Sequence, residues 1–141
     1  MARAADLRQS ALRAKEHGYD RLPMTRFEKT ILQVVPRLNA GGAERTTLEI
    51  ADAVVKSGGR ALVFTEGGRL EEAIKNAGGE IIHGRAASKN PLIMWMNAGV
   101  LSEIIARENV DILHARSRAP AWSASWAARR TGTAFVTTYH G

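Results

Sequence analysis

Cysteine is absent from this 141-residue sequence, and aromatic residues are scarce. Without cysteine the chain has no disulfide bond, no thiolate metal ligand and no cysteine nucleophile. No run approaches the roughly 20 apolar residues of a membrane-spanning helix, and the N-terminus lacks the apolar segment of a secretory signal. The sequence therefore predicts a cytoplasmic protein, and peripheral contact with the inner membrane stays open.

Positive charge is in excess, with 20 Lys and Arg against 14 Asp and Glu and a pI near 10.3. Such a balance suits nucleic acid, an anionic membrane surface or phosphorylated substrates. No run of Lys and Arg is of the kind that tracks a phosphate backbone, and 6% aromatic residues leave few stacking platforms for bases. Nucleic-acid binding is therefore disfavoured, while charge does not distinguish the two other partners.

Residues 1–29 carry seven Lys or Arg and four Asp or Glu with few large apolar side chains. They predict a polar basic N-terminal extension, with a short helix over residues 6–16, before one domain over residues 30–141. Met24 lies a few residues before the first strand-like run. One hypothesis is that residues 1–23 are a misassigned start or a dispensable arm; an intact terminus at Met1 or Ala2 in mass spectrometry would rule it out.

Five short apolar runs rich in Ile, Val and Leu begin near residue 30. Near-continuous runs of this kind suit strands that are buried on both faces. They cover residues 31–35, 61–64, 80–83, 111–114 and 134–139. Four segments with helical spacing of apolar residues lie between them. Glycines 58, 78 and 132 lie where helices should end, and prolines 91 and 120 lie where helices should begin.

Alternating strands and helices imply right-handed crossovers and a parallel sheet with helices on both faces. The predicted fold class is therefore α/β, a Rossmann-like parallel sheet flanked by helices, with 3-2-1-4-5 as the strand order. Ligands of such sheets bind beyond the carboxyl ends of the strands, near the topological switch point. Candidate site residues are therefore expected directly after each predicted strand.

The sequence QVVPRLNAGGAERTTL, residues 33–48, joins a predicted strand to a predicted helix through a glycine pair. Backbone N–H groups at a helix N-terminus bind anions, and Gly41 and Gly42 place no Cβ in the way of a ligand. A phosphate is the natural guest of such a loop. In the alternative reading, the pair only gives the strand-to-helix turn its positive φ values.

Two familiar nucleotide motifs fit this loop poorly. A dinucleotide-binding loop needs G-x-G-x-x-G close to the first strand and an acidic residue after the second. Glu66 follows the second predicted strand, which keeps an NAD-dependent oxidoreductase open as an alternative. However, Arg45 stands where the third small residue should be, and five residues separate Val35 from the glycine pair. No G-x-x-x-x-G-K-[ST] sequence occurs, so a P-loop kinase or ATPase is disfavoured.

Three segments together resemble a known family: ILQVVPRLNAGGAERTTLEIADAV, VDILHARSRAPAW and the terminal FVTTYHG. Through them the span from Ile31 to Gly141 resembles the N-terminal domain of a GT-B glycosyltransferase of family 4. The resemblance implies transfer of a sugar from a nucleotide-diphosphate sugar to an acceptor, without a metal or other cofactor, in a cleft between two Rossmann-like domains. It also implies that Gly41 and Gly42 approach the donor's distal phosphate and that His140 makes a catalytic contact with the transferred sugar.

The chemistry of the transfer agrees with that placement. As the bond between sugar and phosphate breaks, negative charge grows on the leaving diphosphate, so preorganised N–H donors and cations lower the barrier. No protein nucleophile is evident in the sequence. For His140, the alternative is a histidine that only caps the end of the fifth strand.

Candidates for acceptor binding are Arg116, Ser117 and Arg118 after the fourth predicted strand, and Lys89 and Asn90 after the third. The resemblance implies that this domain mostly receives the acceptor. Two guanidiniums are suited to bidentate contacts with a phosphorylated or acidic acceptor. In the alternative reading, the arginines lie in a solvated loop and contribute only net charge.

Several other histidine, tryptophan and apolar residues are predicted to have structural roles and not ligand contacts. His83 and His114 lie at strand ends without the spacing of paired ligands, which argues against a metal site. Trp122 and Trp126 share one helical face, and we expect them in the core. Residues 92–96, LIMWM, are expected in the core as well; a membrane-facing patch suited to a lipid-linked acceptor is the alternative.

The chain departs from the family in extent. The family's second domain, with its carboxylate motif and the basic residues that grip the donor diphosphate, has no counterpart in these 141 residues. We therefore expect a fragment or split-gene product that is inactive without the missing C-terminal domain, and a fifth strand that forms an exposed edge. The alternative is a non-catalytic remnant or binding domain. By resemblance, the setting is the synthesis of bacterial envelope polysaccharide or lipopolysaccharide, with a saccharide or lipid-linked acceptor.

Overall fold

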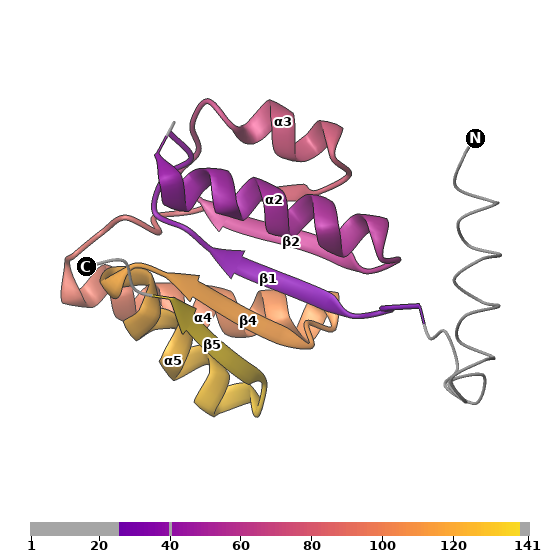
Figure 1. Ribbon diagram of the computed structural model, residues 1–141. Coiled ribbons are helices and arrows are strands. Elements are labelled where there is room, and N and C mark those ends of the chain that lie inside the picture. Colours follow the sequence, from indigo (N-terminus) through magenta and orange to yellow (C-terminus); the bar gives the residue numbers. More distant parts are fainter. Residues whose placement is uncertain (1–25, 40, 139–141) are drawn as a thin grey trace, which may run out of the picture.

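The computed structural model describes residues 26–39 and 41–138, in which strands and helices alternate along the chain (Figure 1). All five predicted strands and all four predicted helices are found there. The strands are β1 (Thr30–Val34), β2 (Arg60–Thr65), β3 (Glu80–His83), β4 (Ile112–Arg116) and β5 (Ala134–Thr138). The helices are α2 (Gly42–Lys56), α3 (Glu71–Asn76), α4 (Pro91–Glu108) and α5 (Arg118–Thr131).

The strands form one parallel sheet in the order β3-β2-β1-β4-β5, which confirms the predicted fold class and strand order. β1 is central, and its Leu32 lies beside Leu62 of β2 and Leu113 of β4. Helices α2 and α3 cover one face of the sheet, while α4 and α5 cover the other (Figure 1). The connection from β3 to β4 crosses to the far side of β1, so the topological switch point lies between β1 and β4.

Each face of the sheet has its own apolar core. Leu32, Leu62 and Leu113 pack with Leu101 and Ile104 of α4 on one side. On the other side, the core contains seven buried residues from the sheet, α2, α3 and the loop after β1: Val35, Leu38, Ala51, Val54, Ala61, Val63 and Ile74. The three central strands, β1, β2 and β4, are therefore buried on both faces, as their near-continuous apolar sequences predict, whereas β3 and β5 at the edges of the sheet are partly exposed.

The predicted ends of the helices are confirmed. Gly58 and Gly78 lie just beyond α2 and α3, and Gly132 caps α5; their φ values are 95°, 93° and 71°. Only glycine adopts such angles without a steric penalty. Pro91 is the first residue of α4, whereas Pro120 is the third residue of α5, which begins at Arg118.

The prediction that Trp122 and the segment 92–96 belong to the core is wrong. Trp122 is 59% exposed, and Trp126 beside it is half-buried. The buried stripe of α5 is made by small residues, Ser123, Ala124, Ala127 and Ala128, which allow close approach. The large indole of Trp122 projects beside that stripe. On α4 the buried stripe begins at Asn97, so Leu92, Trp95 and Met96 of the first turns remain exposed, while Ile93 and Met94 are half-buried.

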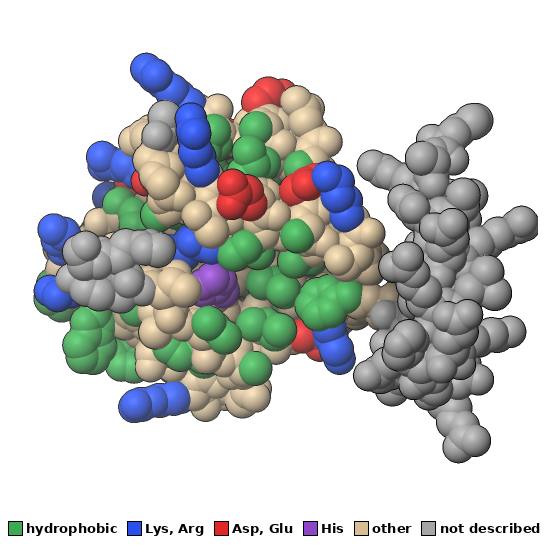
Figure 2. Space-filling model, viewed as in Figure 1, with side chains coloured by type: hydrophobic (Ala, Val, Ile, Leu, Met, Phe, Trp, Pro, Cys, Tyr) green, Lys and Arg blue, Asp and Glu red, His purple; other side chains and the backbone are tan. Residues whose placement is uncertain are grey.

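Strand β5 is an edge of the sheet in the part of the chain that the structure describes, as predicted. Its Val136 is 47% exposed, and Figure 2 shows hydrophobic side chains at the surface over this part of the sheet, next to a histidine. Unpaired strand edges of this kind favour association. Over residues 26–39 and 41–138, no helix is both long enough and apolar enough to cross a membrane.

Candidate functional site

The loops that follow the parallel strands share one edge of the sheet, the edge formed by the carboxyl ends of the strands. At the switch point, Val34 of β1 pairs with Ala115 of β4. This register brings Arg116 beside the loop of residues 35–41, which leads to the glycine pair. The structure therefore brings two of the predicted groups, the glycine loop and residues 116–118, to neighbouring strands at the place where such sheets bind ligands.

The loop after β1 is held by backbone hydrogen bonds to the loop after β2. Leu38 N donates to Gly67 O at 2.8 Å, and Leu70 N donates to Leu38 O at 3.0 Å. Leu38 is fully buried, and Gly68 passes so close to it that a Cβ there would lie 2.4 Å from the Leu38 carbonyl oxygen. The approach to α2 is therefore fixed by main-chain contacts and by packing.

The glycine pair occupies the N-terminus of α2. Gly41 is the N-cap in extended conformation (φ −86°, ψ 173°), and neither glycine has a positive φ, so the reading that the turn requires positive φ values is wrong. A Cβ on Gly42 would meet nothing within 4 Å in the described residues, and the atoms nearest to one on Gly41 would be those of the flexible carboxylate of Glu44, at 2.2 Å. No side chain in the described part of the chain caps the N-terminus of this helix. Among the described residues, neither backbone conformation nor packing requires glycine at position 42, and the missing Cβ leaves space beside the first N–H groups of α2.

Arg116 is the last residue of β4 and only 2% exposed, so the reading of a solvated loop is wrong for this arginine. Its Nε donates to Gln33 Oε1 at 3.2 Å, and Gln33 Nε2 in turn donates to the carbonyl oxygen of Thr47 in α2 at 3.2 Å. Burial lowers the pKa of the Arg116 guanidinium. None of the described carboxylates forms an ion pair with it.

Ser117 connects β4 directly to α5 in an unusual backbone conformation, φ 84° and ψ 161°. This region of the φ/ψ map is almost restricted to glycine. The Ser117 side chain is exposed and does not cap α5, while its N–H donates to Thr138 O at 3.4 Å. Arg118, the first residue of α5, is exposed.

His114, two residues before Arg116 on β4, faces the same side of the sheet and is 8% exposed. Its Nε2 lies 3.2 Å from the Thr138 hydroxyl. Burial, and secondarily the charge of Arg116, lower the pKa of His114. His83 pairs instead with Glu71 of α3. The described residues contain no group of three or more His, Asp or Glu that could hold a metal ion.

The remaining candidates lie elsewhere. Lys89 and Asn90 follow β3 at the outer edge of the sheet; Lys89 is exposed, and Asn90 Oδ1 caps α4 by accepting from Leu92 N at 2.9 Å. Glu66 forms an ion pair with Arg37 (Nε–Oε2 3.2 Å), so the acid that an NAD site would need is engaged by the protein. His140 lies outside the described residues.

Sequence reasoning missed Gln33. Gln33 is 1% exposed and joins Arg116 to α2. The available signal was a polar residue in the middle of the apolar run ILQVV, because a buried amide requires hydrogen-bond partners.

A parallel α/β sheet in the order β3-β2-β1-β4-β5, flanked by helices, defines a Rossmann-like class of domain. The family model of Glycosyltransferase Family 4 matches residues 40–141, so the chain belongs to this glycosyltransferase family. No curated protein matches the chain.

Solved structures agree with this assignment. A glycosyltransferase from Rickettsia africae ESF-5 is 43% identical with a TM-score of 0.73, over 81% of this chain and 30% of that one. A protein assigned as a UDP-N-acetylglucosamine 2-epimerase from Listeria monocytogenes is 12% identical with a TM-score of 0.57, over 79% of this chain and 31% of that one, and it shares the fold alone. The C-terminal domain of the PF1911 hydrogenase from Pyrococcus furiosus also shares only the fold. It is 15% identical with a TM-score of 0.59, over 82% of this chain and 94% of that one. The chain thus spans 30% of the length of the Rickettsia glycosyltransferase.

Proposed function

We propose that this chain forms the acceptor side of a cytoplasmic glycosyltransferase that transfers a sugar from a nucleotide-diphosphate sugar to a saccharide or lipid-linked acceptor of the bacterial envelope. Lipopolysaccharide synthesis is the setting that this proposal favours, with peripheral contact at the inner membrane. Membership of Glycosyltransferase Family 4 supports the reaction class. The donor, the acceptor and the setting belong to the proposal.

The glycine pair carries the donor part of the proposal. Because nothing in the described chain needs glycine at position 42, the absence of a Cβ there is best explained by a ligand that comes close to the backbone. N–H groups at the start of α2 suit the distal phosphate of a nucleotide sugar and stabilise the charge that grows on it during transfer. A bound diphosphate would displace the Glu44 carboxylate, which lies beside Gly41.

The proposed binding of the acceptor rests on Arg116. A buried cation is costly unless an anion or strong dipoles compensate it, and the described chain offers Arg116 an amide rather than a carboxylate. An anionic group of the substrate, such as the phosphate of a lipid-linked acceptor, would supply the missing charge. Ser117 and Arg118 are exposed beside it, and we propose that they contact the same acceptor. Lys89 and Asn90 are further candidates for acceptor contacts, and His140 is the candidate for the catalytic contact with the transferred sugar.

We further propose that turnover requires residues beyond these 141, since the chain spans 30% of the Rickettsia glycosyltransferase. Such residues would come from the same polypeptide or from a second one, and no metal or other cofactor is invoked. Transfer of a labelled sugar by the 141-residue chain alone would contradict this requirement. Failure of transfer even after the remaining part is supplied would favour a non-catalytic binding domain.

The donor site is tested by Gly42→Ala. The added methyl group meets no atom of the described chain but enters the space assigned to the phosphate, so folding should be preserved while binding falls by about tenfold or more. The readout is the change in amide NMR signals when UDP-N-acetylglucosamine, UDP-glucose or GDP-mannose is titrated. Gly99→Ala is the matched control, because a Cβ there also meets nothing within 4 Å. Equal binding by both variants would refute the assignment of the glycine pair.

A further inference from the structure

The first half of α4 exposes a row of large apolar side chains, here called the α4 ridge: Leu92, Trp95, Met96 and Val100. Their exposed fractions are 63%, 57%, 54% and 43%. Residues 92, 96 and 100 are spaced four apart, and Trp95 lies on the adjoining row, so the ridge occupies one side of the helix. Apolar side chains that are gathered in this way mark an interaction surface more often than scattered ones do.

The ridge belongs to the carboxyl edge of the sheet and not to the whole helix. Further along the same side of α4 the exposed residues are Glu103 and Arg107, which are charged. The opposite side carries the buried Leu101 and Ile105, which face the core. The apolar surface is therefore confined to the end of the domain where the candidate site lies.

Positively charged side chains lie in the loop that precedes the α4 ridge. No Asp or Glu occurs between Glu80 and Glu103, and the loop before α4 carries Arg85 and Lys89, both exposed. At the end of the molecule where α4 begins, Figure 2 shows hydrophobic side chains next to those of Lys or Arg. An apolar ridge beside cations is the pattern of surfaces that rest on anionic membranes, and the one described carboxylate that contacts this loop, Glu66 on Ala87 N, is paired with Arg37.

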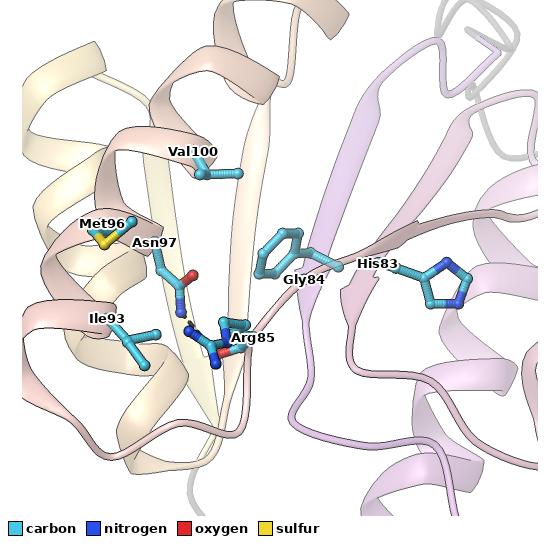
Figure 3. A pocket seen from close by; sticks show the side chains of 8 residues that line it. His83, Gly84, Arg85, Ile93, Met96, Asn97 and Val100 are labelled. Atoms are coloured by element: carbon cyan, nitrogen blue, oxygen red, sulfur yellow. Dashed lines mark hydrogen bonds between the residues drawn. The ribbon is translucent and has the colours of Figure 1, made fainter.

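The loop with the cations is fastened to the helix with the ridge. Asn97 Nδ2 donates to Arg85 O at 2.9 Å, and Gly84 packs so closely on the Phe64 ring that a Cβ would lie 2.1 Å from it. A cavity of about 220 Å³ lies between them, lined by Met96 and Val100 among others (Figure 3). His83 points away from it, toward the other face of the sheet (Figure 3). Ridge and cations thus form one preorganised surface, with an apolar recess behind the ridge.

We propose that the α4 ridge, together with Arg85 and Lys89, docks the protein on the anionic surface of a phospholipid bilayer. The apolar side chains enter between the headgroups, Trp95 lies at the interface, and the cations contact lipid phosphates. The inference rests on the proposed function, because it brings the carboxyl edge of the sheet close to a lipid-linked acceptor. A second copy of the chain fits less well, since a symmetric contact would bring the two sets of cations together.

The test is flotation of the 141-residue chain with vesicles of phosphatidylglycerol and phosphatidylcholine, compared with phosphatidylcholine alone. Wild type should bind the anionic vesicles, and less so at high salt. Trp95→Glu combined with Met96→Glu should lower the partition coefficient more than tenfold, because two apolar contacts are lost. Arg85→Gln and Lys89→Gln should each lower it about fivefold.

The control variants make substitutions of the same kind, apolar to Glu and Arg to Gln, at exposed positions outside the α4 ridge and its loop. Val136→Glu alters an exposed apolar residue of β5, and Arg129→Gln with Arg130→Gln removes two exposed cations at the opposite end of α5; vesicle binding should remain unchanged. Equal losses in the controls, or no binding of wild type to anionic vesicles, would overturn the docking surface. Dimerisation without vesicles that the Trp95→Glu, Met96→Glu variant abolishes would assign the ridge to a homodimer instead.

The vesicle assay also separates this inference from the proposed function. It contains no nucleotide sugar, so Gly42→Ala should float with vesicles like wild type. Conversely, the ridge variants should keep the NMR response to nucleotide sugars, since the ridge lies on α4 and the glycine pair begins α2. Each proposal can therefore fail while the other stands.

Discussion

Replacing Ser117 by glycine should stabilise the protein. Only Asn109 and Ser117 have positive φ among the described residues other than glycine, and Ser117 (φ 84°, ψ 161°) lies where a side chain is least tolerated. Backbone strain of this kind costs about 1–3 kcal/mol. The Ser117 hydroxyl is exposed and forms no cap, so glycine loses no structural contact.

The magnitude follows from two opposing terms. Relief of strain should raise the free energy of unfolding by about 1–3 kcal/mol. The greater conformational freedom of glycine in the unfolded chain should lower it by about 0.5–1 kcal/mol. The free energy of unfolding, measured by urea denaturation, should therefore rise by about 0.5–2 kcal/mol in Ser117→Gly. Asn109→Gly is the control and should stay within about 0.5 kcal/mol of wild type, because Asn109 (φ 50°, ψ 51°) adopts the left-handed conformation readily.

A destabilised or unchanged Ser117→Gly variant would refute this reasoning. The variant also bears on function, because strain kept at the switch point is more easily understood if the serine is used there. Ser117→Ala retains the strain but removes the hydroxyl. If Ser117 contacts the acceptor, both variants should lose acceptor binding, and only Ser117→Gly should gain stability.

Two further predictions concern the stability of the fold around the candidate site. Gly68→Ala should destabilise the fold by about 2 kcal/mol or more, because φ is 150° and the new Cβ would lie 2.4 Å from a carbonyl oxygen; Gly99→Ala, in a helix with open space, should stabilise by about 0.5–1 kcal/mol. Equal urea midpoints for the two would contradict this. For His114, whose pKa is lowered mainly by burial, the unfolded chain binds the proton more tightly. Stability should be fully present above the ordinary pKa near 6.5 and fall as the pH drops below it. His114→Gln should show a smaller fall between pH 7 and 5, and an equal fall would exclude His114 as its source.

The centre of the sheet was predictable because a strand that is buried on both faces has a near-continuous apolar sequence. The run ALVF at residues 61–64 is apolar throughout, and glycines such as Gly58 and Gly78 mark helix ends by a conformation that other residues avoid. Strand order followed from the rules of parallel crossovers, which leave few alternatives once five strands and four helices are recognised.

The exposure of α4 was not predictable in the same way. LIMWM is apolar on every side of the helix, so its sequence does not indicate which side faces the core. The contact that decides is made with α5, where Ser123 Oγ donates to Met94 O at 2.9 Å and small residues replace Trp122 at the interface. Such pairings depend on residues about 30 positions away, which periodicity does not report.

The site shows the same division between local and distant signals. The glycine pair was visible because a loop and its helix are adjacent in sequence. The partner of Arg116 was not, because Gln33 lies 83 residues earlier in the chain. A buried polar residue inside a strand indicates only that some partner exists, and the fold decides which one.

The contacts of Gln33 also join the two groups that we propose for donor and acceptor binding. Its amide accepts from Arg116 on β4 and donates to Thr47 on α2, the helix whose N-terminus carries Gly41 and Gly42. A movement of the guanidinium toward an acceptor anion is therefore resisted by the same strand and helix that position the donor loop. Lysine at position 116 would not reproduce this arrangement, because a single ammonium lacks the planar fork that allows one nitrogen to stay on Gln33 while others face a ligand.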